Sequence, residues 1–420
     1  MTNESKQQRV ADRYITIGFN SDLFLRHPMT GISNYCFQMI RAQQELDQQV
    51  GYLGFTGVGW KDIDETYLAR VASDHGKNFG IEAKKPGLSR RVTATAIETL
   101  AQMAARVTIA RILYRSLRSR NFTRTLGKVS QKIDLFNAFN FQPHGDIEAP
   151  ILPVIYDLSF VRYPEAHPKE RLKLLEAIPE TIARAPLVQT ISQFSKNEIV
   201  SVYGYPENRI IIAPPAASSI FRILGAEVTR RDLGPLALEV DSYFLAVGTL
   251  EPRKNIKILI EAYAQLPPGE RAHCPLVLVG GKGWGHLDLP PQTENLIQSG
   301  CLRFLGIVSD TTLRSLYEGA KILLFPSIYE GFGMPVVEAL ACGTAVAHSG
   351  GTSMDEISGE TEIRVPATDV QAWVNVMLET AGNSRVDTDE VRRARITQAK
   401  TFDWYRSAAT VLDGYRRIVG

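Results

Sequence analysis

Short apolar runs alternate with stretches of helical periodicity along most of the chain. The apolar runs are too short for helices and fit strands that are buried on both faces of a parallel sheet. They lie at residues 14–19, 49–55, 133–136, 151–156, 185–192 and 209–212 in the first half, and at 243–247, 276–279, 303–305, 322–325 and 344–347 in the second. Alternation of strands and helices in both halves predicts an α/β protein with two doubly wound parallel sheets.

The pattern also predicts where one domain ends and the next begins. The periodicity is lost after Pro214-Pro215, which break the preceding strand. We therefore expect a first domain at 1–222, a linker at 223–240 and a second domain at 241–400. A final helix at 401–420 is expected to pack back on the first domain. In such an arrangement the ligand is expected in the cleft between the domains.

Residues 321–351, KILLFPSIYEGFGMPVVEALACGTAVAHSGG, combine a strand, a loop, a helix and a second strand. Pro335 suits the first turn of the helix, and Gly343 suits the position just past its end. The loop carries Glu330 and the helix carries Glu338. A helix N-terminus that faces a glycine-lined loop is an anion site, because its N–H groups and the helix dipole point there.

Two adjacent cations, Arg253 and Lys254, stand in another strand-to-helix loop. Arg as a fork and Lys as a point charge can together neutralise a diphosphate. As an isolated dipeptide they would more often belong to a solvated surface. Asn255 follows them and is predicted to cap the helix at 256–266.

The first half offers two weaker candidates, Gly31 and Asp157. Gly31 stands at the mouth of a helix, where backbone can approach a phosphate or sugar, although a tight turn explains it too. Asp157 follows the strand at 151–156, the position where ligands bind in doubly wound sheets. It could equally cap a turn or helix.

Composition places the chain among soluble globular proteins and indicates a reducing compartment. It has 420 residues, 44% hydrophobic and 22% charged, and its formal net charge of +2 favours no class of partner. The four cysteines, Cys36, Cys274, Cys301 and Cys342, form no CxxC pair, which indicates free thiols and no structural zinc. The polar start is no signal peptide, and no stretch approaches the roughly 20 apolar residues of a membrane span. We expect a cytoplasmic protein.

The segment 84–132 is strongly basic, with twelve Lys and Arg residues and Glu98 as its one acid. Residues 96–117 have the periodicity of an amphipathic helix. Such a helix commonly lies on an anionic membrane surface, here the inner face of the cytoplasmic membrane, or receives an acidic substrate. A solvated face packed on a core is the alternative. Nucleic acid is not expected, because the segment lacks interleaved aromatics and matches no binding motif.

Glu330-x7-Glu338, with GFGMPVV between the glutamates, resembles the signature of the family 4 retaining glycosyltransferases. These enzymes have the glycosyltransferase B (GT-B) architecture, in which two Rossmann-like domains face each other across a cleft. The Gly31 loop and the segments at 156–159, 190–195 and 248–255 follow in the family's order. The similarity covers most of the chain and is strongest at about 242–357.

The resemblance implies a role for each candidate residue. Arg253 and Lys254 would bind the diphosphate of a nucleoside-diphosphate sugar, while Glu330 approaches the sugar and Glu338 holds the ribose hydroxyls. Family members need no protein nucleophile, no cofactor and, in most cases, no metal. The implied catalytic set is Glu330, Asp157, Lys254 and Arg253, and the implied donor-binding set is Gly31, Arg253, Lys254, Gly331, Phe332, Gly333, Met334 and Glu338.

Two positions depart from the family's usual pattern. Many members have His where this chain has Tyr156, and many have Arg where it has Thr249. A subset of the family shares the Tyr-Asp-Leu and Glu-Pro-Arg-Lys-Asn segments, so we interpret the departures as a subfamily trait. Position 249 therefore supplies no phosphate-binding cation, and Arg253 must neutralise more of the negative charge of the diphosphate.

The sequence therefore predicts a retaining glycosyltransferase similar to the mannosyltransferases of bacterial surface polysaccharide and lipopolysaccharide synthesis. GDP-mannose is the first expected donor, with UDP-glucose, UDP-galactose or a deoxyhexose donor also compatible, and a glycan or lipid-linked glycan is the expected acceptor. The main alternative is a non-catalytic protein of the same fold that binds a nucleotide sugar or glycan as an assembly partner. A hydrolase fits less well, because Glu338 lies inside a helix and the nearby cations favour phosphate. A nicotinamide-dependent oxidoreductase lacks its GxGxxG fingerprint.

Overall fold

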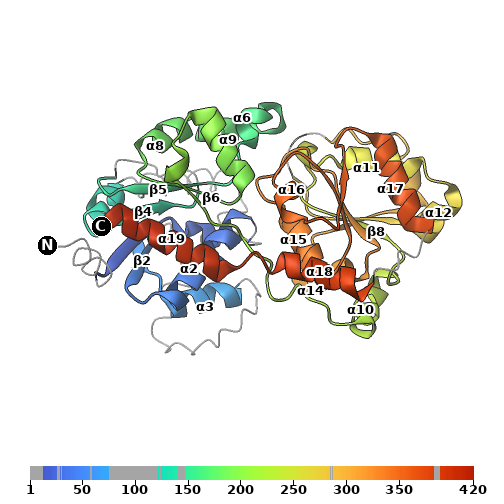
Figure 1. The fold of residues 1–420 in the computed structure, drawn as a ribbon, viewed down its shortest axis with the longest axis horizontal. Coiled ribbons are helices and arrows are strands. Elements are labelled where there is room, and N and C mark those ends of the chain that lie inside the picture. The colour runs from blue at the N-terminus through green and yellow to red at the C-terminus, as the bar shows by residue number, and fades with distance from the viewer. Residues whose placement is uncertain are drawn as a thin grey trace, which may run out of the picture.

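Two parallel sheets, each covered by helices, form the two lobes of the molecule (Figure 1). The computed structural model describes residues 13–25, 29, 31–56, 59–74, 122, 124–140, 147–283, 285, 287–382 and 388–420. The helix expected at 96–117, and most of the basic segment 84–132, lie outside the described residues. Within the described ranges, no helix combines the length and the apolar character needed to cross a membrane.

The first sheet has the strand order β3-β2-β1-β4-β5-β6-β7. Strand β3 pairs antiparallel with β2, and the other pairings of this sheet are parallel. Its strands are β1 (Ile15–Phe19), β2 (Val50–Phe55), β3 (Trp60–Asp62), β4 (Leu135–Ala138), β5 (Ile151–Ile155), β6 (Val188–Thr190) and β7 (Ile210–Ile212). Its helical elements are η1 (Ser21–Leu25), α2 (Ile32–Leu46), α3 (Glu65–Asp74), α6 (Ser159–Arg162), η3 (Pro164–Ala166), α7 (Lys169–Leu175), α8 (Ile178–Arg184), α9 (Gln193–Tyr203) and η4 (Glu207–Arg209).

The second sheet has the order β10-β9-β8-β11-β12-β13, and its pairings are parallel. Its strands are β8 (Phe244–Val247), β9 (Leu276–Val279), β10 (Leu302–Gly306), β11 (Ile322–Phe325), β12 (Val346–Ser349) and β13 (Ile363–Val365). Its helical elements are α10 (Ala226–Leu233), η5 (Gly234–Leu236), η6 (Pro252–Lys254), α11 (Ile256–Ala264), α12 (Pro268–His273), α13 (Thr293–Gln298), α14 (Asp310–Gly319), α15 (Met334–Ala341), α16 (Met354–Ile357), α17 (Val370–Gly382) and α18 (Asp389–Ala399).

The order of the second sheet is that of a doubly wound dinucleotide-type fold, which confirms the predicted fold class. In both sheets the winding direction reverses between two adjacent strands, β1 and β4 in the first and β8 and β11 in the second. A crevice opens at the carboxyl ends of the strands at such a switch point, because the connections leave in opposite directions. The loops after β8 and β11 are therefore placed side by side.

The last helix, α19 (Trp404–Val419), lies along α2 in the first lobe (Figure 1). Asp403 caps its N-terminus by accepting the N–H of Arg406. The Tyr415 hydroxyl lies 3.1 Å from Asn137 Oδ1 and 3.4 Å from Gln43 Nε2, so buried polar contacts fix the helix against α2 and β4. The chain thus crosses between the lobes twice, once after β7 and once before α19.

The segment expected to be the linker, 223–240, is only partly extended. It contains α10 and η5, and α10 packs on α14 of the second domain. The extended crossing comes earlier, at 213–225. Pro214 and Pro215 mark the start of this crossing in the sequence. No local signal assigns α10 to the second domain, because its contacts with α14 form only in the folded protein.

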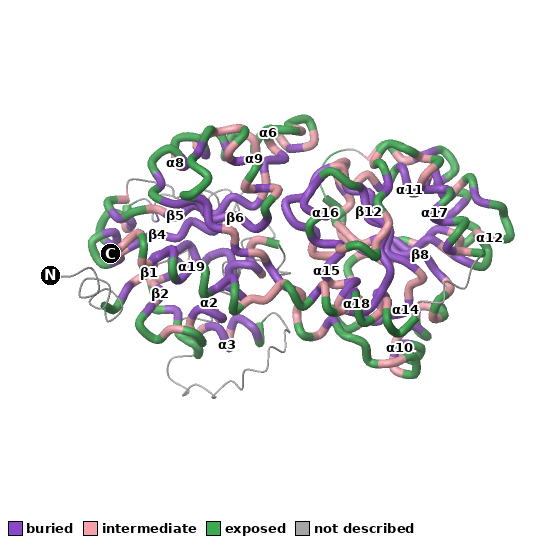
Figure 2. The backbone as a smooth tube through the Cα atoms, in the orientation of Figure 1, coloured by how far each residue is buried: buried purple, intermediate pink, exposed green. Residues whose placement is uncertain are grey.

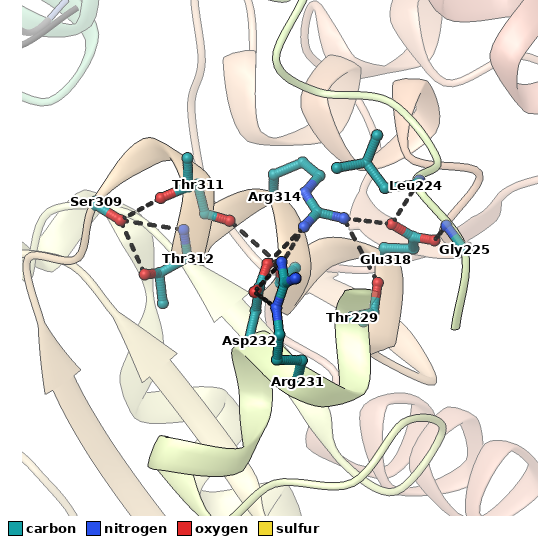
Figure 3. Close-up of polar contacts among 11 residues, drawn as sticks. Leu224, Gly225, Thr229, Arg231, Asp232, Ser309, Thr311, Thr312, Arg314 and Glu318 are labelled. Atoms are coloured by element: carbon teal, nitrogen blue, oxygen red, sulfur yellow. Dashed lines mark hydrogen bonds and ion pairs between the residues drawn. The ribbon is translucent and has the colours of Figure 1, made fainter. Parts of the chain in front are cut away.

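A buried ion network holds α10 and the end of the crossing to α14 (Figure 3). Arg314 is 2% exposed, and its guanidinium lies 2.6 Å from Glu318 Oε2 and 2.8 Å from Asp232 Oδ2. The Glu318 carboxylate also accepts the N–H groups of Leu224, at 3.0 Å, and Gly225, at 2.7 Å. Every charge in this network has a partner, which is the condition for burying ions without a large net cost.

The strands of both sheets form the buried centres of the lobes (Figure 2). One hydrophobic cluster includes residues from both domains, among them Tyr156 and Phe332. The rings of Phe332 and Phe402 meet edge to face at 5.2 Å, so the second crossing packs directly on the loop that follows β11. The two domains therefore share packed apolar side chains as well as two covalent connections.

The Arg314 network yields a stability prediction. Arg314→Leu should destabilise the second domain by about 3–5 kcal/mol, because it leaves Glu318 and Asp232 without their buried cation. Urea unfolding measures this change. Arg231→Leu is the matched control, since Arg231 also pairs with Asp232 but its side chain is 75% exposed, and its loss should cost about 0–1 kcal/mol. Equal losses for both variants would contradict the assignment.

Candidate active site

Glu330 is the centre of a buried group of charges at the switch point of the second sheet. It lies in the loop after β11 and is 6% exposed. Its Oε1 lies 2.5 Å from Lys254 Nζ, and its Oε2 lies 3.0 Å from Arg253 Nη1. Burial raises the pKa of Glu330, but Arg253 and Lys254 lower it by more, so the net pKa is about 2. Glu330 is therefore a carboxylate at neutral pH.

Arg253 and Lys254 belong to η6, in the loop that follows β8. Their side chains are 14% and 13% exposed, so the solvated-surface alternative is wrong. Arg253 also contacts Glu251 Oε1 at 2.7 Å and donates to the Tyr329 carbonyl at 2.5 Å. Burial lowers the pKa of Arg253, but Glu330, Asp157 and Glu251 raise it by more. Both cations already pair with protein carboxylates, which the sequence did not indicate.

Asp157 follows β5 in the first domain and serves as a turn cap. Its Oδ1 accepts the N–H of Ser159 at 2.9 Å and the Ser159 hydroxyl at 2.6 Å. The Ser159 hydroxyl in turn lies 3.0 Å from His167 Nε2. Asp157 also lies against the second domain, because a Cβ added at Gly331 would be 2.7 Å from its own Cβ, and its charge raises the pKa of Arg253. The two interpretations left open by the sequence, cap and site residue, are therefore compatible.

The glycine-rich loop touches the first domain at Gly331. A Cβ added at Gly331 would lie 2.2 Å from the Tyr156 carbonyl oxygen and 2.7 Å from the Asp157 Cβ. The contact leaves no room for a side chain, so this position requires glycine while the two domains are in contact. Ser195, on α9, adds a hydrogen bond across the same contact, from its hydroxyl to the Gly331 carbonyl at 3.3 Å.

The start of α15 has the geometry that the sequence predicted. Gly333 has φ of +119°, a backbone conformation that favours glycine, and the helix begins at Met334 with Pro335 in its first turn. Gly343, with φ of +74°, follows its end. The ring of Phe332 is 4% exposed and meets the ring of Phe402 edge to face, so this side chain contributes to the packing between the domains.

Glu338 and Gly31 lie on different domains. Glu338, on α15, accepts a hydrogen bond from the Tyr317 hydroxyl at 2.9 Å. This bond fixes the orientation of the Glu338 carboxylate. Gly31 has φ of +50° and begins α2, with open space where a side chain would be. Both the turn and the ligand interpretation of Gly31 remain compatible with this position.

Asn255 does not cap α11 as the sequence predicted, and it makes contacts within the site that no sequence pattern indicates. Asn255 precedes α11 but has left-handed backbone and makes no side-chain cap. Its amide instead donates to the carbonyls of Pro326, at 3.2 Å, and Ala367, at 2.7 Å, and so ties the loops after β8, β11 and β13 together. Ser353 supports the glycine loop in the same way, by donating to the Glu330 carbonyl at 2.9 Å.

The chain resembles known proteins over nearly its whole length. A family model described as Glycosyl transferases group 1 matches residues 235–400. The chain is 30% identical to O-antigen chain mannosyltransferase B of Escherichia coli over 397 residues, which cover 93% of this chain and 97% of the relative. It is also 30% identical over 240 residues to serotype-specific mannosyltransferase WbdA of Escherichia coli, where it spans only 29% of the relative's length.

A solved structure, Anabaena Alr3699/HepE in complex with UDP and glucose, has the same fold. It matches with a TM-score of 0.64 and 17% identity, and the match covers 95% of this chain and 99% of that one. The two doubly wound sheets, with this structural match and the relative that matches nearly full length, place the chain among the glycosyltransferases of the GT-B class. Within this class, the chain belongs to the group 1 glycosyltransferases.

The Gly331 contact yields a prediction about domain closure. Gly331→Ala should push the domains apart, because its methyl group collides with the Tyr156 carbonyl and overpacking of this kind costs about 1–3 kcal/mol. Small-angle scattering should show a larger radius of gyration than for the unmodified protein. Gly382→Ala, where a methyl group meets open space, is the control. Identical scattering curves for all three proteins would show that this contact does not hold the domains together.

Proposed function

We propose that the protein is a retaining glycosyltransferase that moves a hexose from a nucleoside-diphosphate sugar to a glycan or lipid-linked glycan in surface polysaccharide synthesis. Mannose from GDP-mannose is the first candidate, supported by the name of the relative that matches nearly full length. The observation that carries the proposal is the pairing of Glu330 with Arg253 and Lys254, at the switch point of the second sheet.

The two cations suit the departure of a nucleoside diphosphate. Negative charge grows on the diphosphate as its bond to the sugar breaks, and fixed cations in a site of low exposure stabilise that charge strongly. The N-terminus of α15 follows the loop that carries Glu330, and it adds the positive end of a helix dipole to this site. These groups can perform this role without a metal ion, so we propose that transfer is metal-independent.

Glu330 suits an electrostatic role better than a nucleophilic one. A carboxylate with a pKa of about 2, held by two cations, is a weak base and a weak nucleophile. Such a group can orient the sugar and favour positive charge at the anomeric carbon. This supports retention without a covalent sugar–enzyme intermediate. Glu338, oriented by Tyr317, suits the ribose hydroxyls, which donate to a carboxylate.

The first domain would supply the acceptor side of the cleft. Asp157 lies there at the carboxyl end of β5, against Gly331 of the donor loop. A lipid-linked acceptor would place the protein at the inner face of the cytoplasmic membrane. The basic segment 84–132 is the proposed membrane contact, and most of it lies outside the described residues.

One observation favours the alternative, a non-catalytic protein of this fold that binds a nucleotide sugar or glycan. Arg253 and Lys254 are already paired with Glu330 and Glu251, and Thr249 supplies no further cation. Turnover separates the two functions, since a binding protein would bind the donor but neither transfer nor hydrolyse its sugar.

Nucleotide binding is the first experiment. Calorimetry with GDP, UDP and dTDP, in buffer with EDTA, should show binding of one nucleotide in preference to the others. Lys254→Ala should weaken that binding by about 1.5–3 kcal/mol, the range for a charged hydrogen bond. Lys257→Ala is the control, because Lys257 is a half-exposed neighbour on α11 whose partner is Asp288. If no nucleotide binds at millimolar concentration, the transferase function is wrong.

Glu330→Gln tests the chemistry separately from binding. It keeps the shape of the side chain but removes the charge that Arg253 and Lys254 surround, so transfer should fall by about a hundred-fold or more. Radiolabelled sugar transfer from GDP-mannose measures the loss, and calorimetry should show that GDP still binds. Transfer at the unmodified rate would reject the role given to Glu330.

A further inference from the structure

Tyr329 connects the two domains at the point where their candidate carboxylates come together. It immediately precedes Glu330 in the donor loop, and its side chain is 4% exposed. The N–H of Leu158, the residue after Asp157, donates to the Tyr329 hydroxyl oxygen at 3.2 Å. One hydrogen bond therefore joins the chain neighbours of Glu330 and Asp157 across the cleft.

The hydroxyl of Tyr329 has a second partner in the first domain. It donates to Glu198 Oε2 at 3.3 Å, and Arg162 holds the same carboxylate with two contacts, at 2.7 and 2.8 Å. The hydroxyl is thus both acceptor and donor, and its position is fixed from two directions. Burial, with the charge of Asp157, raises the pKa of Tyr329, so it stays a neutral phenol that can fill both roles.

The main chain of Tyr329 links this contact to the cations. Its carbonyl accepts a hydrogen bond from Arg253 at 2.5 Å, on the guanidinium that also pairs with Glu330. This main-chain bond lies within the second domain and does not involve the hydroxyl. Loss of the hydroxyl would therefore shift Glu330 relative to Asp157 but leave Arg253 in place beside Glu330.

Ring packing at Tyr329 is separable from its hydrogen bonds. The ring meets Phe194 edge to face at 5.3 Å and Tyr163 at 5.7 Å, both on the first domain. A phenylalanine keeps both ring contacts and loses only the hydroxyl. This makes the role of the hydroxyl testable without opening a cavity.

We propose that Tyr329 is a positioning residue for sugar transfer, whose hydroxyl sets the register between the Glu330 loop of the donor domain and the Asp157 turn of the acceptor side. This role rests on the proposed function. Reacting groups must meet within a fraction of an ångström, and a misplacement of about 1 Å can cost a hundred-fold in rate. The nucleotide is held by groups of the donor domain and does not depend on this register.

The test is Tyr329→Phe, with the donor held at saturation and a glycan acceptor. The kcat of transfer should fall by about ten- to a hundred-fold, while the affinity for GDP or UDP stays that of the unmodified protein. Tyr263→Phe is the matched control, because Tyr263 is also buried and its hydroxyl donates to the carbonyls of Arg271 and Cys274 within the second domain. Its kcat and nucleotide affinity should both be unchanged.

An unchanged kcat in Tyr329→Phe overturns the proposal. A loss of both kcat and nucleotide affinity in Tyr329→Phe and in Tyr263→Phe overturns it too, because such a loss reports general destabilisation. If Tyr329→Phe does not fold, amide exchange of Leu158 in the unmodified protein decides, since the proposal requires that N–H to be protected and fast exchange overturns it. An unmodified protein that binds neither GDP nor UDP and transfers no sugar overturns the proposed function and this role together. Transfer by the unmodified protein with an equally active Tyr329→Phe overturns the role of Tyr329 alone.

Discussion

The ion pairs of Glu330 with Arg253 and Lys254 are the contact on which the site depends. Three charges with little access to water stay together only because each has a partner at 2.5–3.0 Å. The fold brings them together from two loops, since the winding of the second sheet places the end of β8 beside the end of β11. Asn255 and Ser353 donate hydrogen bonds to carbonyls of these loops, which fixes the loops and keeps the charged groups close together.

The first domain contributes to this site through close packing. Within the described residues, the ion pairs of Glu330 are with residues of the second domain. Gly331 lies against the Tyr156 carbonyl with no space for a side chain, and Ser195 and Tyr329 add hydrogen bonds across the same contact. Glu356 of the second domain accepts the N–H groups at the start of α9, at 3.0 and 3.2 Å, which places a carboxylate at a helix N-terminus. The contacts that hold the two domains together therefore also complete the site.

The sequence predicts the elements that have steric or periodic signals. Pro335 and Gly343 mark the ends of α15 because each fits few backbone positions, and the apolar runs place the strands. Arg253 and Lys254 could be read as site or as surface, since burial is a property of the assembled loops. Tyr329 could not be found, because its partners Leu158 and Glu198 lie 171 and 131 positions away. The packing of α10 on the second domain could not be predicted for the same reason, because its partner α14 is distant in the sequence.

If the protein binds a nucleoside-diphosphate sugar as we propose, the charge balance of the site implies that the ion pairs change partners on binding. Arg253 and Lys254 carry two positive charges, and Glu330, Glu251 and Asp157 carry three negative ones around them. A diphosphate brought into this group adds further negative charge, so it can be stabilised only by taking contacts that the cations now make with Glu330. Glu330 is the partner that would yield, because it lies on the glycine loop, the loop proposed to meet the sugar, whereas Glu251 adjoins Arg253 within its own loop. In the proposed reaction this exchange would turn Glu330 from a counter-ion of the cations into a ligand of the sugar, and it would free Arg253 and Lys254 to neutralise the diphosphate.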